Sequence, residues 1–128
     1  MQKLKRTTED YLKTIYLLAR KHNGVRGVEI AEKLNVSHPT VSVIMKRLTE
    51  EGYVIKNAEH KFFLTDEGRK IAENILKKNE MFKTLLTELG VDEQTAAADA
   101  CEMEHAVSTE SFEALQMLTM KKIGGYPL

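Results

Sequence analysis

The chain has little of what marks secreted, membrane-bound or disulfide-held proteins. Its 128 residues include one cysteine, two prolines and no tryptophan. A single cysteine excludes an internal disulfide and is typical of a reducing compartment, where the thiol can act as a ligand. No apolar run approaches the roughly 20 residues of a membrane span. Residues 1–8 are basic and polar with no apolar segment behind them, unlike a secretory signal. We expect a cytoplasmic protein without a membrane partner.

The net charge of zero conceals an asymmetry between the two halves. Residues 1–64 hold 12 Lys and Arg against 7 Asp and Glu, giving +5, and residues 65–128 hold 7 against 12, giving −5. The basic half is where a polyanion would bind, although such an excess also occurs on proteins that bind no nucleic acid. An apolar content of 42% is ordinary for a globular chain of one domain, or of one module plus a dimerisation element.

Hydrophobic periodicity in the first half predicts helices over residues 8–22 and 27–34 and a third that begins after Ser37. Ser37 is a good N-cap, and Pro39 would lie in the first turn, where a missing amide costs nothing. Glu51-Gly52 would end this helix.

Two β-prone runs, residues 53–56 and 61–64, then predict a hairpin. Helix, helix, turn, helix, hairpin is the element order of a winged helix-turn-helix, which we assign to residues 1–70. The tip of the wing would lie against the sugar-phosphate backbone or the minor groove, where Lys56 and Lys61 supply charge.

The outer face of the third helix suits a reader of the DNA major groove. Small hydroxyl groups near its start permit close approach, and the cations further along can hold phosphate. The alternative is an ordinary solvated surface helix. The residues that we expect to contact DNA are Arg26, Ser37, His38, Pro39, Thr40, Ser42, Val43, Lys46, Arg47, Lys56 and Lys61.

The second half predicts three more helices, over residues 66–89, 93–105 and 109–121, so the fold class is mainly α. We assign residues 71–128 to a helical metal-binding and dimerisation domain. Apolar residues here offer surface to a second subunit, although they could instead pack within a monomer. They are Met81, Phe82, Phe112, Leu115, Met117 and Leu118.

Cys101, Glu104 and His105 stand at positions i, i+3 and i+4 and share one face of a helix. Thiolate, carboxylate and neutral imidazole are together a donor set for a divalent transition metal. Taken alone, Cys101 is more often a small buried hydrophobe. With its two neighbours at helical spacing, we expect a metal site.

Several motifs together resemble the diphtheria toxin repressor and manganese transport regulator family of metal-dependent transcriptional repressors, in a short form without an SH3-like domain. They are Glu9-Asp10-Tyr11-Leu12, Ile30-Ala31-Glu32-Lys33-Leu34-Asn35-Val36-Ser37, Pro39-Thr40-Val41-Ser42, Leu64-Thr65-Asp66-Glu67-Gly68 and Cys101-x-x-Glu104-His105. Single pieces occur elsewhere, but the combination covers nearly the whole chain. The resemblance implies Fe(II) or Mn(II) binding, dimerisation through the C-terminal helices and operator binding in the metal-loaded form.

The resemblance also implies a metal ligand at Asp10, at the start of the first helix, beside Cys101, Glu104 and His105. Thr7-x-x-Asp10 also has the form of a helix capping box, which would give Asp10 a purely structural role.

The chain departs from the family at the second metal subsite. Lys13 and Asn79 stand where relatives with two metals have an acid and a histidine, and Lys83 and Ala97 replace ancillary ligands. Protonated lysine is a poor ligand and alanine is none. We therefore expect one metal per subunit, with Lys13 supplying charge that a second cation would have brought.

These features predict a metal-dependent repressor of metal-ion homeostasis that binds a palindromic operator in double-stranded DNA as a homodimer. The mixed donors favour Fe(II), with Mn(II) or other divalent ions as alternatives. A rival is a metal-independent winged-helix regulator with a degenerate site. An enzyme with Glu102 or Glu104 as general base is disfavoured, because the chain has no Gly-rich loop or second polar cluster, and we expect no small-molecule substrate.

Overall fold

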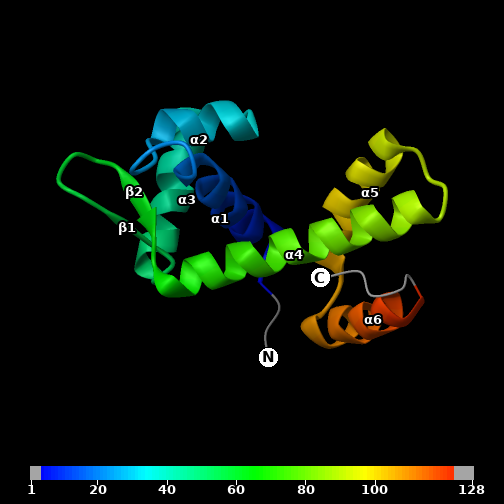
Figure 1. Cartoon of the computed structure of the whole chain (residues 1–128). Coiled ribbons are helices and arrows are strands. Elements are labelled where there is room, and N and C mark those ends of the chain that lie inside the picture. The colour runs from blue at the N-terminus through cyan, green and yellow to red at the C-terminus, as the bar shows by residue number, and fades with distance from the viewer. Residues whose placement is uncertain (1–3, 123–128) are drawn as a thin grey trace. The chain divides into compact units, whose positions relative to one another are not determined.

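The structure is a computed structural model that describes residues 4–122. Within that range the elements are α1 (Arg6–Ala19), α2 (Gly27–Leu34), α3 (His38–Glu50), β1 (Val54–Lys56), β2 (Phe62–Leu64), α4 (Asp66–Glu88), α5 (Glu93–Ala106) and α6 (Thr109–Lys122) (Figure 1). The prediction of a mainly α fold with an N-terminal winged helix-turn-helix is confirmed. None of the helices in the described range is long and apolar enough to span a membrane.

The described chain divides into two compact units, and the division falls inside α4. The first unit, Leu4–Glu73, holds α1 to α3, the hairpin and the beginning of α4. The second unit holds residues 74–122, with the rest of α4, α5 and α6.

The core of the first unit is built from the inward faces of its helices. Val41, Met45 and Leu48 of α3 recur at spacings of four and three residues, and all three are buried. They pack with the apolar face of α1, including Leu12 and Ile15, which are fully buried. This packing fixes which side of α3 points outward.

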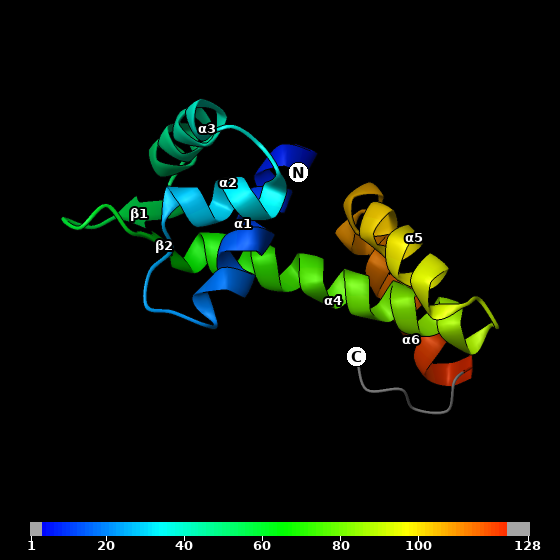
Figure 2. The same ribbon diagram turned by 90° about the horizontal axis from the view of Figure 1, so that it is seen from above.

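The hairpin is a short antiparallel pair in which Ile55 lies opposite Phe63. Its loop is held by Asn57, whose Oδ1 accepts the backbone N–H groups of Glu59 at 3.0 Å and Lys61 at 2.9 Å. The loop extends beyond the helices of its unit (Figures 1 and 2), as expected for a wing.

The start of α4 is packed closely against the chain that enters β1. Thr65 Oγ1 donates to the carbonyl of Gly52 at 2.7 Å and accepts the N–H of Gly68 at 3.2 Å. A Cβ at position 68 would lie 2.2 Å from the carbonyl oxygen of Tyr53. Glycine is therefore required here by contact with neighbouring backbone, which accounts for the Leu64-Thr65-x-x-Gly68 motif.

The core of the second unit joins α4, α5 and α6. Phe82 and Phe112 meet edge to face, with ring centroids 6.5 Å apart, beside the buried Met81. These three were expected to offer surface to a partner subunit. They are instead 0 to 4% exposed within their own unit, because α5 and α6 fold back on α4. Met117 and Leu118, from the same predicted set, are 61% and 51% exposed.

Candidate metal centre and nucleic-acid interface

The third helix begins as predicted. Ser37 is the N-cap of α3, and its Oγ accepts the backbone N–H of Thr40 at 3.3 Å. The same Oγ lies 2.8 Å from Thr40 Oγ1, so the two hydroxyl groups are hydrogen-bonded at the exposed start of the helix. Pro39 occupies the first turn, where its missing N–H leaves no bond unmade.

Most residues expected to contact DNA are exposed, and two are half-buried. The half-buried two are Arg47 and Lys61. Val43 is notable because it is an apolar side chain with 68% exposure near the middle of the outward face. The exposed members of the predicted set are Arg26, Ser37, His38, Pro39, Thr40, Ser42, Val43, Lys46 and Lys56.

Arg47 is engaged inside its own unit. Its Nη2 donates to Thr8 Oγ1 at 3.3 Å, and its Nε lies 3.7 Å from Glu51 Oε1. The guanidinium group therefore links α3 to α1, which sequence spacing did not indicate. Lys46, one residue earlier, is exposed.

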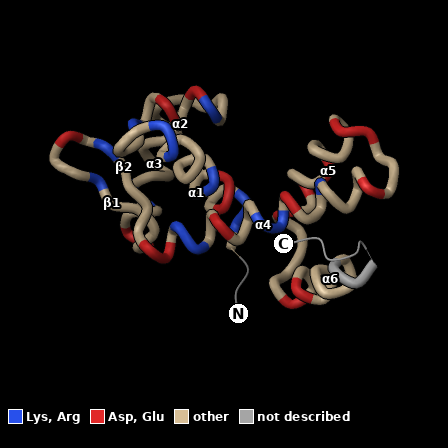
Figure 3. The backbone as a smooth tube through the Cα atoms, in the orientation of Figure 1, with Lys and Arg blue, Asp and Glu red and all other residues tan. Residues whose placement is uncertain are grey.

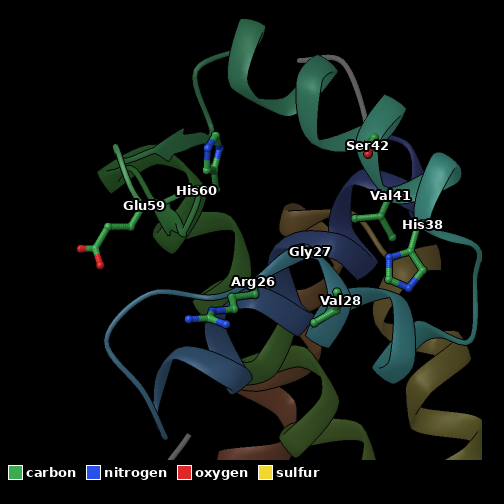
Figure 4. A pocket seen from close by; sticks show the side chains of 8 residues that line it. All are labelled: Arg26, Gly27, Val28, His38, Val41, Ser42, Glu59 and His60. Carbon is green, nitrogen blue, oxygen red and sulfur yellow. The ribbon is translucent and has the colours of Figure 1, made fainter.

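Two open grooves flank α3 in the first unit. One, of about 440 Å³, lies between α3, the start of α2 and the hairpin loop, where Figure 4 shows its lining residues. The other, of about 530 Å³, lies between α3 and the strands and is lined partly by Lys46 and Lys56. The first groove is lined by Arg26, Gly27, Val28, His38, Val41, Ser42, Glu59 and His60.

The wing carries both signs of charge. Figure 3 shows basic colour on both arms of the hairpin and acidic colour near its tip. In the sequence Lys56 ends β1, Lys61 directly precedes β2, and Glu59 lies in the loop between them. Glu59 and His60 line the groove beside α3 but were not among the predicted contacts. Their place could have been inferred from the wing assignment itself, which sets the hairpin loop beside the recognition helix.

The second candidate site lies on α5, which begins at a well-formed cap. Asp92 Oδ2 accepts the N–H of Thr95 at 3.2 Å, and hydrogen bonds from Thr95 lower the pKa of Asp92 below its ordinary value. The cap lies directly before residue 93, where the sequence predicted this helix to begin, and fixes the start of the helix that carries Cys101, Glu104 and His105.

Glu104 and His105 form a buried pair near the end of α5. Glu104 is 0% exposed and His105 is 6% exposed. Oε2 of Glu104 lies 3.4 Å from Nε2 of His105. An ionisable pair that is almost fully removed from water is unusual unless its members bind one another or a shared ion.

The remaining predicted donors are arranged differently. Cys101 is half-buried on α5, and Glu102 is exposed, as expected. Among residues 4–122 no group of three or more His, Cys, Asp or Glu side chains is close enough to hold a metal ion. The described structure thus brings together two of the predicted ligands.

Asp10 is half-buried on α1, in the first unit. The helix begins at Arg6 with Lys5 as its N-cap and no side-chain cap bond, so the capping box considered at Thr7 does not form. Asp10 Oδ2 instead lies 3.7 Å from Arg6 Nε, one turn earlier.

Two adjacent residues of α4 hold α5, and sequence reasoning assigned neither this role. Asn79 Nδ2 donates to Glu104 Oε1 at 2.8 Å. Lys78, which is 5% exposed, donates from Nζ to the carbonyl of Val107 at 2.8 Å. A signal was present, since residue 79 follows Ile75 by four positions and precedes Phe82 by three, on the inward face of the helix.

The Glu104–His105 pair fits a divalent transition metal. Bonds of roughly 2.0–2.2 Å to nitrogen and oxygen in a tetrahedral shell put neighbouring donors about 3.3–3.6 Å apart. The observed 3.4 Å lies in that range. A borderline ion accepts both carboxylate and imidazole, so the chemistry of the two donors also fits.

Residues 3–60 match the family described as "Iron dependent repressor, N-terminal DNA binding domain", and residues 65–121 match "Iron dependent repressor, metal binding and dimerisation domain". The chain is 37% identical to an uncharacterized HTH-type transcriptional regulator of Methanocaldococcus jannaschii, over 92% of this chain and 96% of the relative. It is 36% identical to the transcriptional regulator MntR of Escherichia coli, over 88% of this chain and 73% of the relative.

A solved structure of a manganese-dependent transcriptional repressor in complex with manganese superposes with a TM-score of 0.77 at 30% identity. The match covers 93% of this chain and 53% of that one. These relatives are regulators of transcription rather than enzymes, and the resemblance proposed from the motifs is confirmed. The chain therefore belongs to the iron-dependent repressor family of metal-dependent transcriptional repressors, to which MntR and the diphtheria toxin repressor are related, and carries its DNA-binding domain and its metal-binding and dimerisation domain.

Proposed function

We propose that this protein is a metal-activated repressor that binds a palindromic operator as a homodimer and controls metal-ion homeostasis. The observation that carries the proposal is the buried Glu104–His105 pair, 3.4 Å apart, in the domain that the family uses to bind metal. Fe(II) is the favoured ion, because a thiolate beside nitrogen and oxygen donors suits it better than Mn(II), which prefers oxygen and nitrogen.

The proposed ligands are Asp10, Cys101, Glu104 and His105, with one ion per subunit. When bound, the metal would supply a positive charge that four donors share. Asp10 belongs to the DNA-binding domain and the other three belong to α5. A ligand set drawn from both domains would restrict their relative motion. Less conformational entropy would then be lost when the dimer binds two operator half-sites.

The DNA contacts are proposed from exposure and charge. Ser37, Thr40 and Ser42 present small polar groups at the start of α3, and Lys46 and Lys56 line the groove between α3 and the wing. The small polar groups would contact base edges, and the two lysines would contact phosphate groups. Arg47 contributes indirectly, because its contacts with Thr8 and Glu51 hold α3 in place.

For the dimer, a second copy of the chain is the proposed partner. Met117 and Leu118 of α6 are the large apolar side chains of the predicted dimer set that remain exposed. Burying them against their symmetry mates would remove this surface from water and place two α3 helices about a two-fold axis.

A metal-independent regulator is the second candidate. It is favoured by the lack of a three-donor cluster in the described part of the chain. Calorimetric titration with Fe(II) under anaerobic conditions, Mn(II), Co(II) and Zn(II) separates the two. The proposal expects one tightly bound ion per chain, lost in Glu104→Gln and retained in Glu102→Gln, a matched change at an exposed neighbour. Equal binding by both variants, or no binding by the wild type, would favour the second candidate.

A further inference from the structure

Asn79 of α4 and Glu104 of α5 are 25 residues apart in sequence and are joined by a direct hydrogen bond. The donor is Nδ2 of Asn79, the acceptor is Oε1 of Glu104, and the distance is 2.8 Å. A carboxylate oxygen can only accept, so the amide nitrogen must face it. The bond therefore fixes the orientation of both side chains.

The carboxylate that accepts this bond belongs to a side chain whose conformational freedom is already limited by burial. Glu104 is fully buried, and its second oxygen, Oε2, lies 3.4 Å from Nε2 of His105. Because Oε1 accepts the Asn79 hydrogen bond, rotation about the last side-chain bond of Glu104 is restricted. The position of Oε2 beside His105 then follows from the Asn79 contact.

Lys78 supplies a second tie between the same two helices. Its Nζ donates to the carbonyl of Val107 at 2.8 Å, just beyond the end of α5. A cation is favourable at that end, because the last carbonyls of a helix carry partial negative charge. The neighbouring residues 78 and 79 therefore hold the end of α5 at two points, on either side of His105.

We propose that Asn79 is a positioning residue of the metal site: its amide sets the Glu104 carboxylate so that Oε2 and Nε2 of His105 form a prepared pair of donors for one divalent ion. The inference rests on the metal site proposed above. Hydrogen bonds of this kind fix the geometry of metal-binding side chains before the ion arrives, so that less ordering is required on binding.

The same bond limits the number of ions. A carboxylate that bridges two metal ions through its two oxygens must turn each oxygen toward an ion, and here Oε1 faces the Asn79 amide instead. Glu104 is thereby dedicated to a single ion. Asn79 therefore does more than replace the histidine ligand that the resemblance implies for relatives with two metals. Its amide also holds Glu104 in an orientation that suits a single ion.

Co(II) alone is a suitable probe, since its visible absorption reports the ligand geometry. Calorimetry and absorption spectra are to be recorded on the full chain for the wild type, Asn79→Leu and Asn74→Leu. The last variant makes the same change on the same helix, five residues away and on a different face. Far-ultraviolet circular dichroism of the metal-free proteins establishes that each is folded.

The wild type is expected to bind one Co(II) per chain. Asn79→Leu is expected to bind about 10- to 100-fold more weakly and to show a changed spectrum at saturation. Asn74→Leu should match the wild type. A purely structural role for Asn79 would lower the melting temperature of the metal-free protein but leave the affinity and the spectrum unchanged, and that result would overturn the inference.

If Asn79→Leu does not fold, Asn79→Ala takes its place, because position 79 is only half-buried and truncation there leaves no sealed cavity. A wild type that binds no Co(II) overturns the metal site and the inference together. If the wild type binds Co(II) and Asn79→Ala binds it equally well with the same spectrum, only the role of Asn79 is overturned. Two Co(II) ions per wild-type chain would contradict the dedication of Glu104 to one ion.

Discussion

Oε2 of Glu104 lies 3.4 Å from Nε2 of His105, and both side chains are buried near the end of α5. Neighbours in a helix point about 100° apart, so such a pair meets only when something turns the side chains together. Here Asn79 holds the other oxygen of Glu104. The donor pair is therefore a product of packing between α4 and α5 as much as of the local sequence.

Cys101 should determine how strongly the site distinguishes soft from hard ions. In Cys101→Ser we expect Co(II) and Zn(II) affinity to fall by at least about tenfold and Mn(II) affinity to change less, because thiolate prefers the softer ions. The near-ultraviolet absorption of Co(II)–thiolate coordination should disappear in the variant. If the wild type shows no such absorption at saturating Co(II), the Cys101 sulfur is not a ligand.

Val43 is expected to contact the methyl group of a thymine in each half-site. Its side chain is apolar, 68% exposed and set among polar neighbours on the outward face of α3. Removing one methyl contact costs about 0.8 kcal/mol, or about fourfold in affinity per half-site. Replacing one operator thymine at a time with uracil should reveal one position in each half-site with this penalty.

The penalty should vanish in Val43→Ala and persist in Val43→Ile, which keeps the apolar contact. Fluorescence anisotropy with labelled operator DNA measures both. A uracil penalty of the same size in Val43→Ala would show that another residue contacts the methyl group.

Gly68→Ala should destabilise the protein even though alanine favours helices. A Cβ at this position would lie 2.2 Å from the carbonyl oxygen of Tyr53, which is backbone and cannot move without displacing β1. We expect a loss of about 1–3 kcal/mol in the free energy of unfolding. Urea denaturation should show this loss, whereas Gly27→Ala, with its nearest side-chain atom at 3.8 Å, should be neutral or slightly stabilising.

Tyr11→Phe should leave stability unchanged or raise it by up to about 1 kcal/mol. Burial raises the pKa of Tyr11, and its hydroxyl has no hydrogen-bond partner in the described part of the chain. Removing this oxygen relieves an unsatisfied buried group. Tyr16→Phe is the matched control, since Tyr16 donates to Glu73 Oε2 at 3.2 Å and should lose stability. A clear loss in Tyr11→Phe would indicate a partner for the hydroxyl.

Local signals in the sequence predicted the elements well where capping residues define them. Ser37 and Asp92 each begin a helix at the expected place, because a side-chain oxygen that accepts a backbone N–H is a short-range feature. The end of α1 was predicted near His22 but falls at Ala19, where i to i+3 bonds such as Arg20 N–H to Leu17 O replace the helical pattern. Where a helix changes to these i to i+3 bonds depends on the turn that follows it more than on apolar periodicity.

The candidate site was only partly predictable. The donor types at Cys101, Glu104 and His105 follow from spacing on one helix, but the Asn79 contact depends on how closely α4 and α5 pack. Likewise, Arg47 was assigned to phosphate from its charge, whereas its contact with Thr8 follows from the packing of α3 on α1. The side chains that share one face of a helix can be inferred from the sequence. Contacts between helices can be identified only once the fold is known.

In the proposed function, a metal ion held through Glu104 switches on operator binding. The most direct test selects double-stranded DNA from a random pool with the Fe(II)-loaded protein and then measures binding to the selected sequence after chelation and after single metals are added back. We expect chelation to abolish specific binding. Fe(II) should restore it most effectively in the wild type, and no metal should restore it in Glu104→Gln. Equal binding before and after chelation, with every metal and in both proteins, would contradict the claim.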